Sequence, residues 1–311
     1  IPFTDIWTTA AARRQAAKWY AAKASAQTEG ITPPLEDDRY VLARESQVPI
    51  GDQLVTIPLL AARSLTVNGT ELNLVPASCW QAVGPGAFIA EIRNGQNEAV
   101  ARVHRKYSLN DWDILLEQHV ENLSGTNLSI RWSQYGPPNL EADRSRYMDR
   151  RRFRYGWLLG PKLDPDRLAG VVADGSQLLE LTDVASESAS SVLWPNEDAV
   201  AEGFELSWFA STNRYFALAI HPTESPTGHL DLSLQSVVGE ITRLSAKIDD
   251  EVVILTGLAW PARNAPDLVL APGEAKSLSM GIYAGPMTEA MLLGLVALRS
   301  GKKIEWDAKK M

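Results

Sequence analysis

The chain has 311 residues and a mass of 34.1 kDa, with 30 Lys and Arg against 38 Asp and Glu, which gives a formal net charge of −8. With 45% hydrophobic residues it can bury a large core, and its acidic balance argues against wholesale nucleic-acid binding. The single cysteine, Cys79, excludes an intramolecular disulfide.

The first residues favour a helix followed by a linker. The segment Asp5–Gln27 is rich in alanine and contains neither Pro nor Gly, and such a composition loses little entropy in a helix. Thr32-Pro33-Pro34 then indicates a short extended linker. Residue 1 is Ile and no signal peptide is visible, so we expect a processed chain or an excised segment. We interpret residues 1–38 as a helical segment and linker ahead of a folded domain.

From residue 39 onward, apolar residues alternate with polar ones and turn signals separate the runs. The clearest signal is Asn68-Gly69, which stands between two alternating runs and favours a type I′ hairpin turn. A second turn signal is Asn94-Gly95, and a third is Ser124-Gly125, across which we expect the runs 114–120 and 128–132 to pair. Further alternating runs are at 230–234, 244–248, 268–270 and 278–282. The pattern predicts a large antiparallel β sandwich over residues 39–286.

The chain after the last predicted strand has helical composition. Within Met287–Arg299, apolar residues recur at spacings of three and four, and this predicts an amphipathic helix and tail over residues 287–311. Its apolar face includes Met291, Leu292 and Leu295. This face either packs on the sandwich or couples the domain to a partner.

Motifs for catalysis, metal binding or cofactor binding are not found. The sequence contains no G-x-S-x-G, H-E-x-x-H, C-x-x-C, P-loop or G-x-G-x-x-G motif. The four histidines, His104, His119, His221 and His229, form no pair with metal-binding spacing. We therefore predict a protein that is not an enzyme and that holds no metal or cofactor.

One cluster of cations interrupts the acidic chain. Six arginines lie within eleven residues, interleaved with aromatic residues and followed by Trp157: Arg144, Arg146, Arg150, Arg151, Arg152 and Arg154. Guanidinium groups pair well with phosphate, and aromatic side chains favour the edge of a bilayer. The cluster is thus a candidate contact for anionic lipid or an acidic partner, or alternatively a solvated segment paired with this protein's own carboxylates.

Three segments occur in an order that resembles the periplasmic domain of the bacterial YidC membrane-protein insertases. The run Trp208–Pro222 is similar to the family's W-x-x-x-x-x-x-Y-F-x-x-A-x-x-P segment. Tyr107–Leu109 with Val120–Ser124 resembles its strand and turn. Val269–Glu274 with Ile282–Pro286 resembles its closing strands and exit into a helix. The three matches cover roughly residues 101–295.

This resemblance implies a β-supersandwich, a fold shared with galactose-mutarotase-like proteins, on the periplasmic side of the bacterial inner membrane. It also implies that residues 1–38 follow a membrane anchor. It implies a non-catalytic domain that assists insertion and folding of inner-membrane proteins by scaffolding or partner binding. The implied partners are the membrane core of the same parent chain, Sec translocon components, nascent membrane proteins and the membrane surface, with no nucleic acid.

Two alternatives stay open. The first is a sugar-binding or mutarotase-like envelope protein on the same fold, which requires a His and a carboxylate within about 7 Å of each other that open on one concave face for proton transfer. Its candidate residues are His104, His119, Glu205, Trp112 and Trp208. The second is a stand-alone envelope protein that docks on lipid or a partner through the arginine cluster.

Overall fold

The computed structural model describes residues 10–35, 46–50, 53–109, 113–140, 151–158, 171–178, 191–195, 200, 203–213, 216–223, 233–248 and 251–286. The chain divides into two units, residues 1–44 and 45–311. In the first unit, the predicted helix is confirmed as α1 (Ala10–Ala24). The predicted boundary between residues 38 and 39 and the predicted helix and tail at 287–311 lie outside the described residues.

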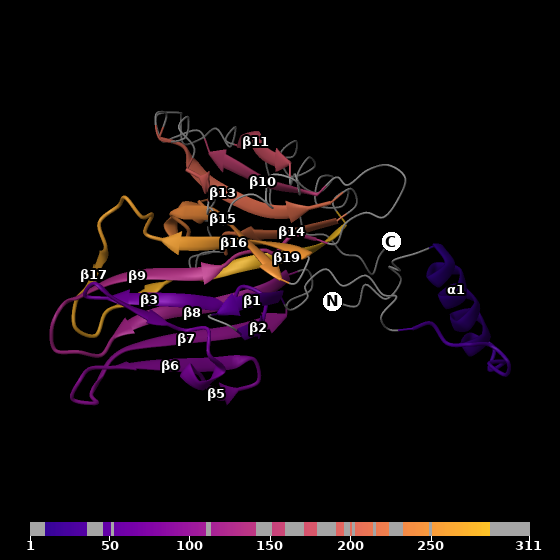
Figure 1. The fold of residues 1–311 in the computed structure, drawn as a ribbon, viewed down its shortest axis with the longest axis horizontal. Helices are drawn as coiled ribbons and strands as arrows, with labels where there is room; N and C mark the ends of the chain where they lie inside the picture. The colour runs from indigo at the N-terminus through magenta and orange to yellow at the C-terminus, as the bar shows by residue number, and fades with distance from the viewer. Residues whose placement is uncertain are drawn as a thin grey trace. The chain divides into compact units, whose positions relative to one another are not determined.

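The second unit is built from antiparallel β-sheets (Figure 1). The larger sheet has ten described strands, and Figure 1 shows β5 and β11 at its opposite edges. Its order is β11 (Val171–Leu178), β10 (Arg152–Leu158), β13 (Glu205–Thr212), β14 (Phe216–His221), β19 (Met280–Pro286), β8 (Asp113–Asn122), β7 (Ala99–Leu109), β6 (Ala87–Arg93) and β5 (Gln81–Gly84), with β18 (Ala275–Ser277) also paired to β8.

The smaller sheet has seven described strands, and a separate two-stranded hairpin precedes it in the chain. The seven-stranded sheet has the order β12 (Ser191–Trp194), β15 (Glu240–Ile248), β16 (Glu251–Trp260), β9 (Leu128–Tyr135), β3 (Ala62–Val67) and β4 (Thr70–Asn73), with β17 (Leu268–Leu270) paired to β9. The hairpin consists of β1 (Ser46–Ile50) and β2 (Gln53–Ile57), and short 3-10 helices lie at Ala77–Cys79 and Leu234–Ser236. The predicted fold class, a mainly β antiparallel sandwich of large sheets, is confirmed.

The hairpin turn at Asn68-Gly69 is also confirmed. Strands β3 and β4 pair around it, and both turn residues have positive φ, 50° for Asn68 and 80° for Gly69. A type I′ turn requires this conformation at both central positions, which is why Asn-Gly forms it so readily.

The expected pairing across Ser124-Gly125 is wrong, because the chain changes sheet there. Strand β8 lies in the ten-stranded sheet and β9 in the seven-stranded sheet. Asn122 organises the crossing: its Nδ2 donates to the carbonyl oxygens of Thr126 (2.8 Å) and Leu270 (2.9 Å), and its Oδ1 accepts from the Ser124 amide (2.8 Å). An alternating pattern identifies a strand but does not identify the sheet to which it belongs.

The predicted run at 230–234 is only partly described. Leu234 lies in a 3-10 helix rather than in a strand, and residues 230–232 lie outside the described residues.

The core lies between the two large sheets. It combines inward residues of β3 and β9 with those of β6, β7 and β8, among them Leu65, Ile130, Val103 and Val120, each no more than 1% exposed. Polar groups also bridge the sheets, since Gln118 Nε2 of β8 donates to Gln134 Oε1 of β9 at 2.7 Å. The described inward residues of the ten-stranded sheet that belong to this core are therefore packed against the seven-stranded sheet.

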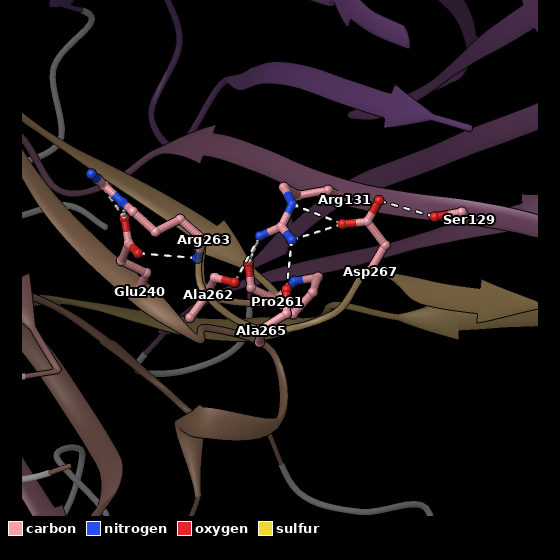
Figure 2. A network of polar contacts seen from close by, with 8 residues as sticks. All are labelled: Ser129, Arg131, Glu240, Pro261, Ala262, Arg263, Ala265 and Asp267. Carbon is pink, nitrogen blue, oxygen red and sulfur yellow. Dashed lines mark hydrogen bonds and ion pairs between the residues drawn. The ribbon is translucent and has the colours of Figure 1, made fainter. Parts of the chain in front are cut away.

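A network around Arg131 fixes the loop between β16 and β17 (Figure 2). The Arg131 guanidinium donates to the carboxylate of Asp267 (2.7 Å) and to the carbonyl oxygens of Pro261, Ala262 and Ala265 (2.7 to 3.0 Å). Hydrogen bonds from Arg131 and Ser129 lower the pKa of Asp267. Because this guanidinium is already saturated with partners, it serves the fold and not a ligand.

Candidate functional site

The candidate site lies on the outer face of the ten-stranded sheet, which we define as the face turned away from the seven-stranded sheet. Side chains alternate between the faces of a strand, and directly paired residues point to the same side. On β14, Leu218 and Ile220 are 0% exposed and point inward, so Ala217, Ala219 and His221 point outward. The pairing places Gly281 and Tyr283 of β19 on the same outer face.

His221 forms the central feature of this face. Its Nε2 lies 3.5 Å from Oδ2 of Asp113, and its Nδ1 is 2.8 Å from the carbonyl oxygen of Pro222, which can only accept a hydrogen bond. Nδ1 therefore carries a hydrogen and Nε2 faces the carboxylate. Burial alone would lower the pKa of His221, but the hydrogen bond and charge of Asp113, together with the Pro222 carbonyl, outweigh it and raise this pKa. Both side chains keep part of their surface exposed, 34% for His221 and 24% for Asp113.

Glycines allow the two large rings of this face to lie flat on the sheet. The imidazole of His221 lies over Gly281 and the indole of Trp208 lies over Gly156, and a Cβ at either glycine would overlap the ring. His221 and Trp208 are on the neighbouring strands β14 and β13, but the rings lean in opposite directions, toward β19 and β10 respectively.

Small residues lie beside these two rings. Ala210 of β13 pairs with Ala219 of β14, and Thr212 pairs with Ala217. Ala210 and Ala217 are buried at the base of the larger side chains that surround them, whereas Trp208 and Tyr283 are half-buried. The outer face thus has an alanine floor with an aromatic ring and a histidine–carboxylate pair at its rim, an arrangement suited to a flat polar ligand with an apolar face.

A second histidine group lies on the same face, on strands β7 and β8. His104 and His119 are paired in register, and their rings stack with centroids 4.3 Å apart. Glu121 lies 3.6 Å from Nε2 of His104 and 3.8 Å from Nη1 of Arg102. Burial and the neighbouring His104 lower the pKa of His119, although Glu121 acts in the opposite direction. Glu121 therefore lies between His104 and Arg102.

The arginine cluster is partly described. Arg144, Arg146 and Arg150 lie outside the described residues. Arg151 is buried at 7% exposure. The side-chain amide of Asn139 is best oriented with its nitrogen donating to the Ile254 carbonyl oxygen and its oxygen accepting from Arg151 Nη1 at 2.7 Å. Arg152 and Arg154 lie in β10 on the outer face, opposite Thr212 and Ala210. Contact of this cluster with anionic lipid or an acidic partner stays a prediction.

The other predicted residues are scattered. Trp157 packs among aromatic residues, with its ring centroid 6.0 Å from that of Phe204 and 6.2 Å from that of Trp194. Glu205 begins β13, which is four strands from β7, or about 19 Å at the usual strand spacing, so it does not join His104. Trp112 and the predicted coupling residues Met291, Leu292 and Leu295 lie outside the described residues. Of the sugar-site candidates that the structure describes, Trp208 and Glu205 lie on β13, the strand that neighbours the strand of His221.

Sequence reasoning missed the pairing of His221 with Asp113. The alternation of Phe216–His221 could have placed His221 on the same face as Ala217 and Ala219, opposite the apolar Leu218 and Ile220. Nothing in the sequence indicated that Asp113 would reach His221, because that contact depends on β19, a strand from the end of the chain, lying between β14 and β8.

Membrane-spanning helices and metal-binding clusters are both absent among the described residues. Within those residues, no helix combines the length and apolar character needed to cross a bilayer. Among the same residues, His, Cys, Asp and Glu form no group of three or more that could hold a metal ion.

Comparison with known proteins finds similar solved structures but no match to a family model or to a curated protein. A galactose mutarotase related enzyme from Lactobacillus acidophilus is 11% identical, with 72% of this chain and 80% of that chain covered and a TM-score of 0.42. A galactose mutarotase-like protein from Lactobacillus casei is 9% identical, with coverage of 73% and 82% and a TM-score of 0.37. A putative aldose 1-epimerase from Escherichia coli K12 is 13% identical, with coverage of 73% and 82% and a TM-score of 0.35.

The predicted membership of the YidC insertase family is wrong, and so is the role in membrane-protein insertion and transport. No insertase is found among the similar structures, and several of them are named as galactose mutarotase-like or aldose 1-epimerase proteins. The run that suggested the family, Trp208–Pro222, spans β13, the connection at Asn213 and β14. Such strand and turn residues are needed wherever two strands pair in a sandwich, so they report the fold and not the family.

The prediction that the chain is not an enzyme is also overturned. The similar structures include proteins named as a mutarotase-related enzyme and as an aldose 1-epimerase. The prediction relied on missing sequence motifs, whereas His221 and Asp113 come together only through strand pairing. The periplasmic location at the inner membrane and the implied partners stay predictions.

Proposed function

We propose that this protein binds a carbohydrate on the outer face of the ten-stranded sheet and interconverts its anomers. The observation that carries the proposal is the His221–Asp113 pair, whose Nε2 and Oδ2 are 3.5 Å apart on a half-exposed sheet face. This distance meets the requirement of about 7 Å for two groups that transfer protons to one bound ligand.

The chemistry follows from the two protonation states. Asp113 removes the proton from the anomeric hydroxyl while His221, protonated at Nε2, donates a proton to the ring oxygen. The bond between the anomeric carbon and the ring oxygen breaks, the carbonyl of the open-chain sugar forms, and reclosure on the other face of that carbonyl restores both protons. The anomeric and ring oxygens are attached to one carbon, so two groups this close can serve both.

The surroundings of the pair fit a sugar ring. A pyranose has an apolar face formed by its C–H groups and a rim of hydroxyls, and aromatic side chains stack on that face. Trp208 supplies a half-buried indole on the strand next to His221, and the small side chains of Ala210 and Ala219 pair beside it.

The His104–His119 group supports this chemistry less well. Its carboxylate, Glu121, lies against both His104 and Arg102, so its oxygens already face two partners. The lowered pKa of His119 means that this ring holds a proton less readily than a free histidine does.

The test is the rate at which freshly dissolved α-D-glucose or α-D-galactose approaches anomeric equilibrium, followed by proton NMR. We expect the purified chain to accelerate this step for at least one sugar and the variant His221→Gln to lose about 100-fold of the acceleration, as loss of a general acid does. His104→Gln makes the same chemical change at the second histidine group and should keep the activity. Absence of both acceleration and saturable binding across common aldoses would contradict the proposal.

A further inference from the structure

Two arginines border the alanine floor on the side opposite His221. Arg152 and Arg154 are half-buried residues of β10, and pairing places them on the outer face next to Thr212 and Ala210 of β13. The row that contains Arg154 continues through Ala210, Ala219 and Tyr283 to Asp113. One continuous row of the sheet therefore runs from Arg154, across two alanines and Tyr283, to Asp113, whose carboxylate faces His221.

The dimensions of this row suit a single substituted sugar. Two strand spacings, about 10 Å, separate the backbone at Arg154 from that at Ala219. His221 lies two residues farther along β14, about 7 Å from Ala219. Because an arginine side chain is long and flexible, its guanidinium can reach the far substituent of a ring whose anomeric centre is at His221.

We infer that the preferred ligand is an acidic saccharide, a uronic acid whose carboxylate is bound by Arg152 and Arg154 while its anomeric centre lies at His221 and Asp113. This inference rests on the proposed function and adds the substrate class. A guanidinium presents two parallel N–H groups that match the two oxygens of a carboxylate. No hydrogen bond or ion pair to the Arg152 guanidinium occurs among the residues that the structure describes.

The two arginines are local cations on a protein that is otherwise acidic. With a net charge of −8, the protein repels anionic ligands in general. Two adjacent cations beside the proposed site offset that repulsion locally. A neutral sugar has no charge through which these cations could attract it.

The test compares matched ligands on the full chain by isothermal titration calorimetry at low salt: D-glucose with D-glucuronic acid, D-galactose with D-galacturonic acid, and D-glucose 6-phosphate. We expect a uronic acid to bind at least about 10-fold more tightly than its neutral parent, in keeping with hydrogen bonds to a charged group. Arg152→Gln combined with Arg154→Gln should remove that preference and leave neutral-sugar affinity within about twofold. Lys106→Gln removes one cation from the same face but on β7, and should leave the preference intact.

The possible outcomes separate this inference from the proposal on which it rests. Binding of neutral sugars with no preference for uronic acids overturns the acidic-ligand inference and leaves the proposed function standing. Preference for the 6-phosphate over the uronic acid overturns the carboxylate assignment. Absence of any saccharide binding overturns both. Arg152→Lys provides a check if the double variant does not fold, because it keeps the charge, loses the paired N–H groups and should weaken uronate binding several-fold.

Discussion

The two histidine groups of the outer face have similar composition and opposite electrostatics. Each places a histidine Nε2 within 3.6 Å of a carboxylate oxygen. Asp113 and the Pro222 carbonyl overcome burial and raise the pKa of His221, whereas burial and His104 lower the pKa of His119. In the second group the carboxylate contacts His104, whereas the lowered pKa belongs to His119, so a carboxylate within a group does not ensure that every ring beside it holds a proton.

The largest expected effect comes from removing the carboxylate that distinguishes the two groups. Asp113→Asn keeps the shape of the side chain but takes away the charge that stabilises protonated His221. We expect anomerisation to fall at least about 100-fold, the usual contribution of a general base, and the pKa of His221 to fall as well. NMR measurements of the anomerisation rate and of the His221 titration test both effects.

The matched change in the second group is Glu121→Gln. It removes a carboxylate close to His104 and Arg102. Anomerisation should nevertheless change less than about twofold, because the proposed site uses His221 and Asp113 and no residue of the second group. Equal losses from Asp113→Asn and Glu121→Gln would show that the outer face has no single reaction centre.

A smaller effect is expected from moving the ring instead of deleting its partner. In Gly281→Ala the new Cβ occupies the space of the His221 imidazole, so the ring must shift and its contact with Asp113 is disturbed. We expect anomerisation to fall about 10-fold, as for a modest misplacement of a catalytic group, and the pKa of His221 to fall. Gly95→Ala is the matched control, because a Cβ at Gly95 meets no atom within 4 Å. An unchanged His221 titration in Gly281→Ala would contradict the described ring position.

These contacts also show how much of the molecule could be predicted from its sequence. Alternating apolar and polar residues predicted the sandwich, and the dipeptide Asn68-Gly69 predicted the hairpin turn, because both signals are local in the chain. The changes of sheet after Asn122 and after Leu270 were not predictable, since side-chain period alone is the same whichever sheet a strand joins.

The site is a sharper case of the same limit. His221 and Asp113 are 108 positions apart, and neither belongs to a sequence motif. Their contact requires β19 to lie between β14 and β8, so it is a consequence of topology. The arginine cluster, in contrast, was visible in the sequence, but only the structure shows that Arg152 and Arg154 share a face while Arg151 is buried.

A still smaller effect is expected within the second group itself. In His104→Gln the neighbouring ring that can carry positive charge is removed from beside His119. The pKa of His119 should then rise, because one of the two causes that lower it, the neighbouring His104, is gone and only burial remains. Two-dimensional NMR of the histidine ring protons measures the change, and a pKa that stays the same or falls would contradict the stacked arrangement.

The smallest expected effect is on stability against pH, where the two histidines should have opposite signs. The raised pKa of His221 gives a stabilisation that is fully present below the unfolded pKa of about 6.5 and is lost as pH rises through the higher folded pKa. The lowered pKa of His119 means that the unfolded chain binds the proton more readily, so its contribution becomes destabilising as pH falls from about 6.5 through the lower folded pKa. The free energy of unfolding in urea, measured between pH 5 and 8, tests both signs. Relative to the parent chain, His221→Gln should lose more stability at the acidic end, whereas the stability of His119→Gln should be most favourable at that same end. The same sign for both variants would mean that Asp113 does not stabilise protonated His221, and the distinction between the two groups would no longer hold.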